Sequence, residues 1–135
     1  MREIDAKTLN RTFGKVIFCG GEELGEYEWE RLRNGTPLGK RIVWLAYWYE
    51  SGCYEGSGKA VYLDSLGTWH QDDLGHCSCY GPFDGGFNDL PYTLEQVIET
   101  QGKAWAREEH SAYQQGLIKA LKRKLKQQQS KGGKK

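Results

Sequence analysis

Residues 41–50 constrain the fold more than any other segment, because they are apolar at almost every position. The sequence Arg-Ile-Val-Trp-Leu-Ala-Tyr-Trp-Tyr-Glu places apolar side chains on both alternating faces of an extended chain. A strand of this kind has to be covered on two sides, so it belongs in the interior of a sheet. We therefore predict a central strand over 42–50.

Two later segments continue the alternating pattern. Residues 59–63 (Lys-Ala-Val-Tyr-Leu) and 68–72 (Thr-Trp-His-Gln-Asp) predict strands, and Asp64-Ser65-Leu66-Gly67 between them predicts a turn. With the central strand they form an antiparallel β-meander over 42–50, 59–64 and 68–73.

The pattern before the central strand is weaker. Phe13–Cys19 is short, apolar and followed by Gly20-Gly21, which predicts a strand. Residues 26–30 (Glu-Tyr-Glu-Trp-Glu) alternate strictly, whereas the longer run 22–33 is also compatible with a helix. We predict the strand, because alternation over five residues is the more specific pattern.

The C-terminal third has helical periodicity. Thr93-Leu94-Glu95-Gln96 has the spacing of a capping box, which predicts a helix from about residue 94, and Gly102 is a candidate for its end. A second helix is predicted over 107–128. Its apolar stripe consists of Tyr113, Leu117, Ile118, Leu121 and Leu125, and its opposite face carries Lys119, Lys122, Arg123 and Lys126. Because strands precede helices, the predicted fold class is α+β, an antiparallel β-meander sheet packed by C-terminal helices.

The length of 135 residues fits one domain, which we place at 1–128, followed by a basic tail over 129–135 that we expect to be disordered. The sequence has no run of about 18 apolar residues and no secretory signal, so we expect a cytoplasmic protein without membrane contact.

Charge is distributed unevenly along the chain. Residues 1–109 hold 18 acidic and 11 basic side chains, a net charge of −7, whereas residues 110–135 hold eight basic side chains and no acidic one. A basic arm of this kind is typical of segments that bind phosphate or another anionic surface, and it is also compatible with a solvated face.

Two segments combine aromatic side chains with glycines and are expected to connect strands. They are residues 53–58 and 76–86. Aromatic side chains on such connections suit an interface with a macromolecule. The candidate binding residues there are Tyr54, Glu55, Ser57, His76, Tyr80 and Phe83.

A metal site is the alternative for the second segment. His76, Cys77 and Cys79 stand within four residues, and imidazole with thiolate is a favoured ligand set for zinc. Their spacing argues against it, because structural zinc sites usually use two cysteines separated by two residues. We therefore expect no cofactor and keep zinc at these three residues as an alternative.

No catalytic residue is assigned. His76 and Cys77 are adjacent, so on a strand their side chains would point apart instead of forming a nucleophile and base. Catalysis is the less favoured interpretation, although the sequence leaves it open.

The motifs Trp48-Tyr49-Glu50, Tyr54-Glu55-Gly56-Ser57-Gly58 and Gly75-His76-Cys77-Ser78-Cys79-Tyr80-Gly81-Pro82 resemble small uncharacterised proteins encoded by phages and prophages. The resemblance covers about residues 41–86 and assigns a role to none of them. It implies a viral accessory protein in the host cytoplasm, in a class that includes anti-CRISPR and other counter-defence inhibitors.

Three functions follow as hypotheses. The first is a non-enzymatic, stoichiometric binding protein whose partner is a host protein or protein complex. The second is a nucleic-acid or nucleotide binder that uses the basic C-terminal helix, and the third is a small metal-binding domain at His76, Cys77 and Cys79.

Overall fold

A computed structural model describes the chain in nine segments, some of them in backbone alone. They are residues 2–3, 14–24, 30, 32–34, 38–51, 55–74, 76–77, 90–104 and 108–133. Its elements are β1 (Arg2–Glu3), β2 (Lys15–Gly21), the 3₁₀ helix η1 (Leu38–Arg41), β3 (Ile42–Ser51), β4 (Glu55–Asp64), β5 (Trp69–Asp73), β6 (His76–Cys77), α3 (Leu94–Lys103), the 3₁₀ helix η2 (Glu108–His110) and α4 (Ser111–Gly133).

The strands form one sheet in the order β1-β2-β3-β4-β5, with β6 beside the start of β4. The predicted meander is confirmed, because β3 pairs antiparallel with β4 and β4 pairs antiparallel with β5. The predicted strand over 13–19 is also confirmed as β2, but it lies parallel to β3. The sheet is therefore mixed, and β3 lies inside it as its sequence requires.

The prediction of a strand over 26–30 meets the described residues only at Glu30. β2 and β3 are parallel, and parallel neighbours need a longer connection than a hairpin. Glu30 is helical, as are residues 32–34, and Leu32 is fully buried against the sheet. Residues 25–29 lie outside the described residues.

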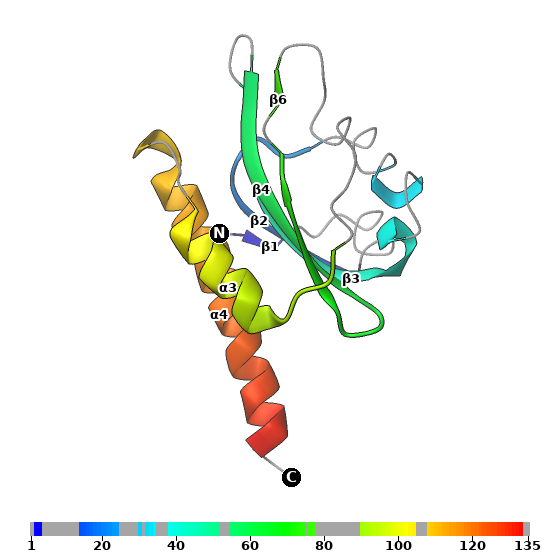
Figure 1. Ribbon diagram of the computed structural model, residues 1–135. Helices are drawn as coiled ribbons and strands as arrows, with labels where there is room; N and C mark the ends of the chain where they lie inside the picture. Colours follow the sequence, from blue (N-terminus) through cyan, green and yellow to red (C-terminus); the bar gives the residue numbers. More distant parts are fainter. Residues whose placement is uncertain are drawn as a thin grey trace.

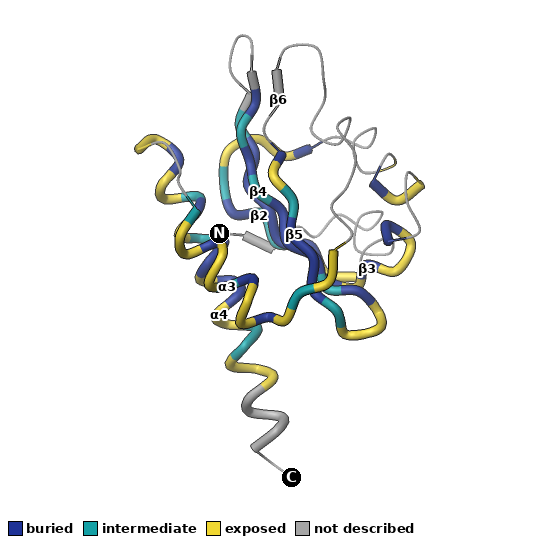
Figure 2. Tube along the Cα trace, in the orientation of Figure 1, coloured by how far each residue is buried: buried dark blue, intermediate teal, exposed yellow. Residues whose placement is uncertain are grey.

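The two faces of the sheet carry separate hydrophobic clusters. Along β3, Leu45, Tyr47 and Tyr49 join the cluster under the β2–β3 connection, whereas Trp44 and Trp48 join the cluster under the helices. Figure 1 shows this arrangement: α3 and α4 lie together on one side of the sheet and η1 lies on the other. The apolar composition of residues 41–50 is thus explained by burial on both faces (Figure 2).

Both predicted helices are present. α3 begins at Leu94 after a complete capping box: the Thr93 hydroxyl accepts the Gln96 N–H at 3.1 Å, and the Gln96 side-chain oxygen accepts the Thr93 N–H at 2.8 Å. α3 ends at Lys103, just after Gly102. α4 continues to Gly133, so residues 129–133 are helical in backbone where the sequence predicts a disordered tail.

None of the helices in the described part of the chain is long and apolar enough to span a membrane.

Candidate nucleic-acid interface

The apolar stripe of α4 packs on the sheet as its periodicity predicts. Leu117 and Leu121 are fully buried in the cluster that contains Trp48, and Leu125 packs at the edge of this cluster. Burying each such side chain stabilises the fold by about 1.5–3 kcal/mol. One face of α4 is therefore occupied by the protein's own core.

A chain of buried hydrogen bonds fixes the rotation of α4 about its axis. The Trp48 indole N–H donates to the Gln114 side-chain oxygen at 2.7 Å. The Gln114 amide donates to both the backbone and the side-chain oxygen of Gln101, at 2.9 and 3.0 Å, and the Gln101 amide donates to Gln71 at 2.8 Å. Because an indole N–H only donates, it sets the orientation of each amide after it. The chain connects β3, α4, α3 and β5.

The start of α4 is held at the ends of β2 and β3. His110 Nε2 lies 2.8 Å from a carboxylate oxygen of Glu50, the last side chain described on β3. The His110 ring contacts Trp48 and stacks on Tyr113, with ring centroids 5.1 and 6.0 Å apart. A Cβ at Gly20 would overlap the Tyr113 ring, so glycine at this position permits the close approach of β2 and α4. These contacts fix the direction of the helix.

The opposite face of α4 is basic and exposed. Its cations are Lys119, Lys122, Arg123 and Lys126, all four exposed to solvent. At 100° per residue they share one face, and they cover about 10 Å along the axis. Within the described part of the chain, none of these four forms an ion pair. Lys124 instead lies over the Trp44 ring, 5.8 Å from its centroid. We call the four exposed cations the basic face.

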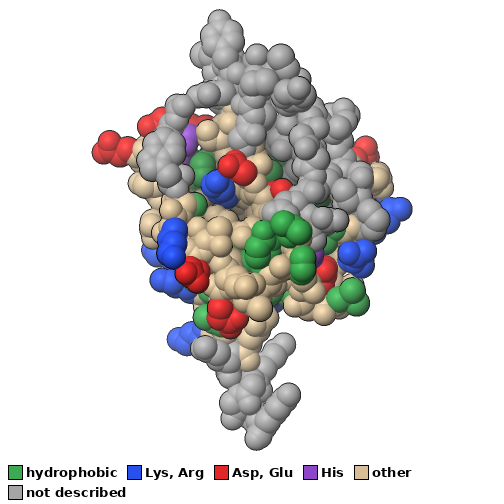
Figure 3. Space-filling model, in the orientation of Figure 1, with side chains coloured by type: hydrophobic (Ala, Val, Ile, Leu, Met, Phe, Trp, Pro, Cys, Tyr) green, Lys and Arg blue, Asp and Glu red, His purple; other side chains and the backbone are tan. Residues whose placement is uncertain are grey.

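Charges of opposite sign occupy the two ends of α4. Glu108 and Glu109 lie in η2 immediately before the helix, whereas its basic side chains begin only at Lys119, more than two turns into the helix. This order complements the helix dipole, which is positive at the N-terminus and negative at the C-terminus. Figure 3 shows Lys and Arg side chains along the flank formed by α3 and α4. The dipole accounts for the order of acidic and basic side chains along α4. It does not account for the concentration of the basic side chains on one face.

The two segments rich in glycine and aromatic residues meet at one end of the sheet. β6 pairs with the start of β4, so that Glu55 lies opposite Cys77 and Gly56 lies opposite His76 in the backbone. Ser57 follows on β4 and is half-buried. The other predicted binding residues, Tyr54, Tyr80 and Phe83, lie outside the described residues. No pattern in the sequence indicates that β6 pairs with β4.

The proposed zinc ligands receive no geometric support within the described residues. No group of three or more His, Cys, Asp or Glu side chains there is placed to hold a metal ion. Cys79 and the side chains of His76 and Cys77 lie outside that part of the structure. Cys19 is described, and burial raises the pKa of its thiol to about 12, so it stays protonated at neutral pH.

Sequence reasoning missed a buried ionic contact at the β4–β5 turn. His70 Nε2 lies 2.9 Å from a carboxylate oxygen of Asp64, and His70 Nδ1 lies 3.0 Å from the carbonyl oxygen of Leu90. Each ring nitrogen of His70 therefore faces an oxygen atom that can accept a hydrogen bond. The contact ties residue 90 to the meander. In the sequence, only the turn predicted from Asp64 onward indicated that this region has a structural role.

Asp64 also organises the turn itself. Its second carboxylate oxygen accepts the backbone N–H groups of Leu66 and Thr68, both at 2.9 Å. Burial alone would raise the pKa of Asp64, but the hydrogen bond from His70 and these two N–H groups outweigh it and hold the pKa below its ordinary value. Asp64 therefore remains ionised and structural.

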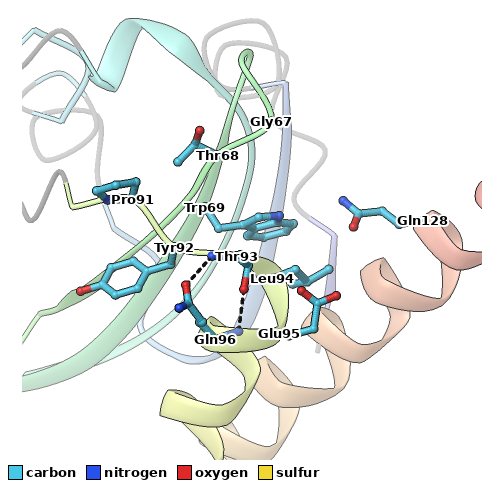
Figure 4. A pocket seen from close by; sticks show the side chains of 10 residues that line it. All are labelled: Gly67, Thr68, Trp69, Pro91, Tyr92, Thr93, Leu94, Glu95, Gln96 and Gln128. Atoms are coloured by element: carbon cyan, nitrogen blue, oxygen red, sulfur yellow. Dashed lines mark hydrogen bonds between the residues drawn. The ribbon is translucent and has the colours of Figure 1, made fainter.

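A shallow groove of about 510 Å³ borders this turn (Figure 4). It is lined by Gly67, Thr68, Trp69, Pro91, Tyr92, Thr93, Leu94, Glu95, Gln96 and Gln128. The side chains of Thr93 and Gln96 are engaged in the capping box, and Glu95 places a negative charge beside the start of α3. We assign no ligand to this groove.

Comparison with family models, with curated proteins and with solved structures gives no match for this chain. Its function therefore has to be argued from the geometry alone.

Proposed function

We propose that the protein is a non-enzymatic, stoichiometric binding protein that holds nucleic acid on the basic face of α4. One observation carries the proposal: four exposed cations without ion pairs among the described residues share one face of a helix whose opposite face is buried. The charge is held on a fixed helix, so it can contact several phosphates at once.

The charge on α4 favours a ligand with many negative charges over a ligand with one. DNA carries one negative charge per about 1.7 Å of duplex, and neutralising several phosphates releases condensed counterions. The remainder of the chain is acidic, with a net charge of −7 over residues 1–109, and it repels the same ligand. We therefore expect binding to be confined to α4 and to depend steeply on salt.

Fluorescence anisotropy with a labelled DNA duplex tests the proposal across a salt series. If all four cations contact phosphate, the logarithm of the binding constant falls with the logarithm of salt concentration at a slope of about −3.6. The double variant Lys122→Gln/Lys126→Gln should bind more weakly and reduce this slope by about two.

The matched control is Arg33→Gln/Lys40→Gln, which removes the same charge from exposed residues outside α4. Lys40 belongs to η1, on the other side of the sheet. Equal losses in the two double variants would show a general charge effect, and would contradict an interface on α4.

The pairing of β4 with β6 favours a second candidate function. It joins Glu55 and Gly56 to His76 and Cys77, and these residues belong to the two segments predicted to bind a host macromolecule. In this alternative the protein is a viral counter-defence inhibitor. Tyr54→Ala and Tyr80→Ala should then abolish binding to a protein partner isolated from the host, while DNA binding stays unchanged.

A further inference from the structure

Lys15 lies beside α4, although the two are far apart in the sequence. It begins β2 and is in register with Trp44 of β3. Side chains alternate along a strand, so Lys15 points to the same face of the sheet as Ile17 and Cys19, which belong to the cluster under the helices. On this face Lys124 of α4 lies over the Trp44 ring, 5.8 Å from its centroid. The exposed Lys15 therefore adjoins the second half of α4.

The flank of α4 that faces β2 also carries part of the basic face. Gly20 of β2 lies against the Tyr113 ring, and α3 packs on the other flank of α4 (Figure 1). At 100° per residue, Arg123 is the member of the basic face nearest to the Tyr113 flank. Arg123, Lys124 and Lys15 thus follow one another from the exposed side of the helix to the sheet. The positively charged surface continues from α4 onto the start of β2.

The opposite end of α4 is acidic. Glu108 and Glu109 precede the helix in η2, and both are exposed. The exposed Glu22 lies at the same end, where its N–H donates to the Tyr49 carbonyl oxygen. At 1.5 Å per residue, Lys119 lies about 15 Å from Glu109 along the axis, beyond the screening length of about 8 Å at physiological salt. A nucleic acid that ran along α4 would approach these carboxylates, whereas one that crosses the second half of α4 avoids them.

We propose that the nucleic acid crosses the second half of α4 and continues onto the start of β2, where Lys15 contacts its phosphates. This inference rests on the proposed function and adds a binding residue and the path of the ligand. Lys15 is the exception, beside α4, to the acidic character of residues 1–109. Its ammonium group adds one contact to those of the basic face, and Glu108 and Glu109 disfavour an orientation along the helix.

The variant Lys15→Gln tests the added contact, with the labelled DNA duplex and a salt series. Each phosphate contact contributes about 0.9 to the salt slope, so five contacts predict a slope of about −4.5 for wild type and about −3.6 for the variant. At low salt the variant should also bind at least about threefold more weakly. Lys40→Gln is the matched control, because Lys40 is an exposed lysine on the other side of the sheet, and it should bind as wild type does. Circular dichroism confirms that each variant is folded.

The variant Glu108→Gln/Glu109→Gln tests the path. If the duplex crosses α4 beyond the screening length, removing these two charges should change its affinity by less than about twofold at physiological salt. If the duplex ran along α4, the same variant would bind it severalfold more tightly, and this result would overturn the inference.

The outcomes distinguish the two proposals. Equal binding by Lys15→Gln and wild type, or equal losses in Lys15→Gln and Lys40→Gln, would overturn the path onto β2. The basic face would remain the binding surface if Lys122→Gln/Lys126→Gln still bound more weakly. No binding by wild type, or undiminished binding by Lys122→Gln/Lys126→Gln, would overturn both proposals.

Discussion

The two faces of α4 differ in burial and in charge. The face toward the sheet holds fully buried leucines, Leu117 and Leu121, and the buried amide of Gln114. The opposite face holds the basic face, whose cations are exposed to solvent and form no ion pair among the described residues. One face of α4 therefore packs against the core, and the opposite face exposes positive charge. Substitutions on the two faces should change different measurements.

The largest effect is expected on the buried face. Leu117→Ala/Leu121→Ala should destabilise the protein by about 4–10 kcal/mol, because each deletion removes about 2–5 kcal/mol of packing. This approaches the whole stability of a domain, about 5–15 kcal/mol. Urea unfolding followed by circular dichroism measures it. The control Gln115→Ala on the exposed side should change little, and an unchanged unfolding midpoint in the double variant would show that α4 is not docked.

The next largest effect lies away from α4 and should leave binding intact. Asp64→Asn removes the carboxylate from the buried contact with His70, which should cost about 3–5 kcal/mol. DNA affinity of the folded fraction should be unchanged, because the basic face is not involved. Asp73→Asn is the control, since Asp73 forms a surface ion pair with Lys59 worth at most about 1 kcal/mol.

Asp64 should also make the free energy of unfolding depend on pH, in a predictable direction. The folded protein holds the pKa of Asp64 below its ordinary value of 3.8, so the carboxylate stabilises the fold above that value. This contribution is lost as pH falls through the lowered pKa. The difference in unfolding free energy between wild type and Asp64→Asn should therefore shrink in acid. A difference that stays constant down to about pH 2 would show that Asp64 does not titrate as proposed.

A smaller effect is expected from the polar part of the buried face. Gln114→Ala leaves the Trp48 N–H and the Gln101 side-chain oxygen without their Gln114 partner, which should cost about 1–3 kcal/mol. Chemical unfolding measures the loss, with the neighbouring Gln115→Ala as control. Equal stability of the two variants would mean that water replaces the missing amide.

The smallest effect on stability should come from the basic face. Lys122→Gln/Lys126→Gln removes two exposed charges and should change the unfolding free energy by no more than about 0.5 kcal/mol. If this variant unfolds much more easily than wild type, the basic face contributes to the fold, and weaker DNA binding would no longer identify an interface.

Much of this comparison could be predicted from sequence because both faces of α4 follow a single local period. Leu117 and Leu121 lie one turn apart, and so do Lys119 and Arg123, so 100° per residue separates the two sets without knowledge of the fold. The capping box at Thr93 and the double burial of β3 are local in the same sense. The helical backbone of residues 129–133 was missed, because these residues are polar and resemble a disordered tail in composition.

The sequence by itself therefore determined β2, β3, β4 and β5, the two C-terminal helices, the α+β class and the position of the four cations. Tertiary structure alone decided that β2 lies parallel to β3, that β6 pairs with the start of β4, and that His70 contacts Asp64. It also joined Trp48 to Gln114 across 66 residues. Periodicity in the sequence indicates which side of a helix or strand is buried, because burial repeats with the geometry of the backbone. It does not indicate which residue a buried side chain contacts, because one indole or amide can bond to many partners until the chain folds.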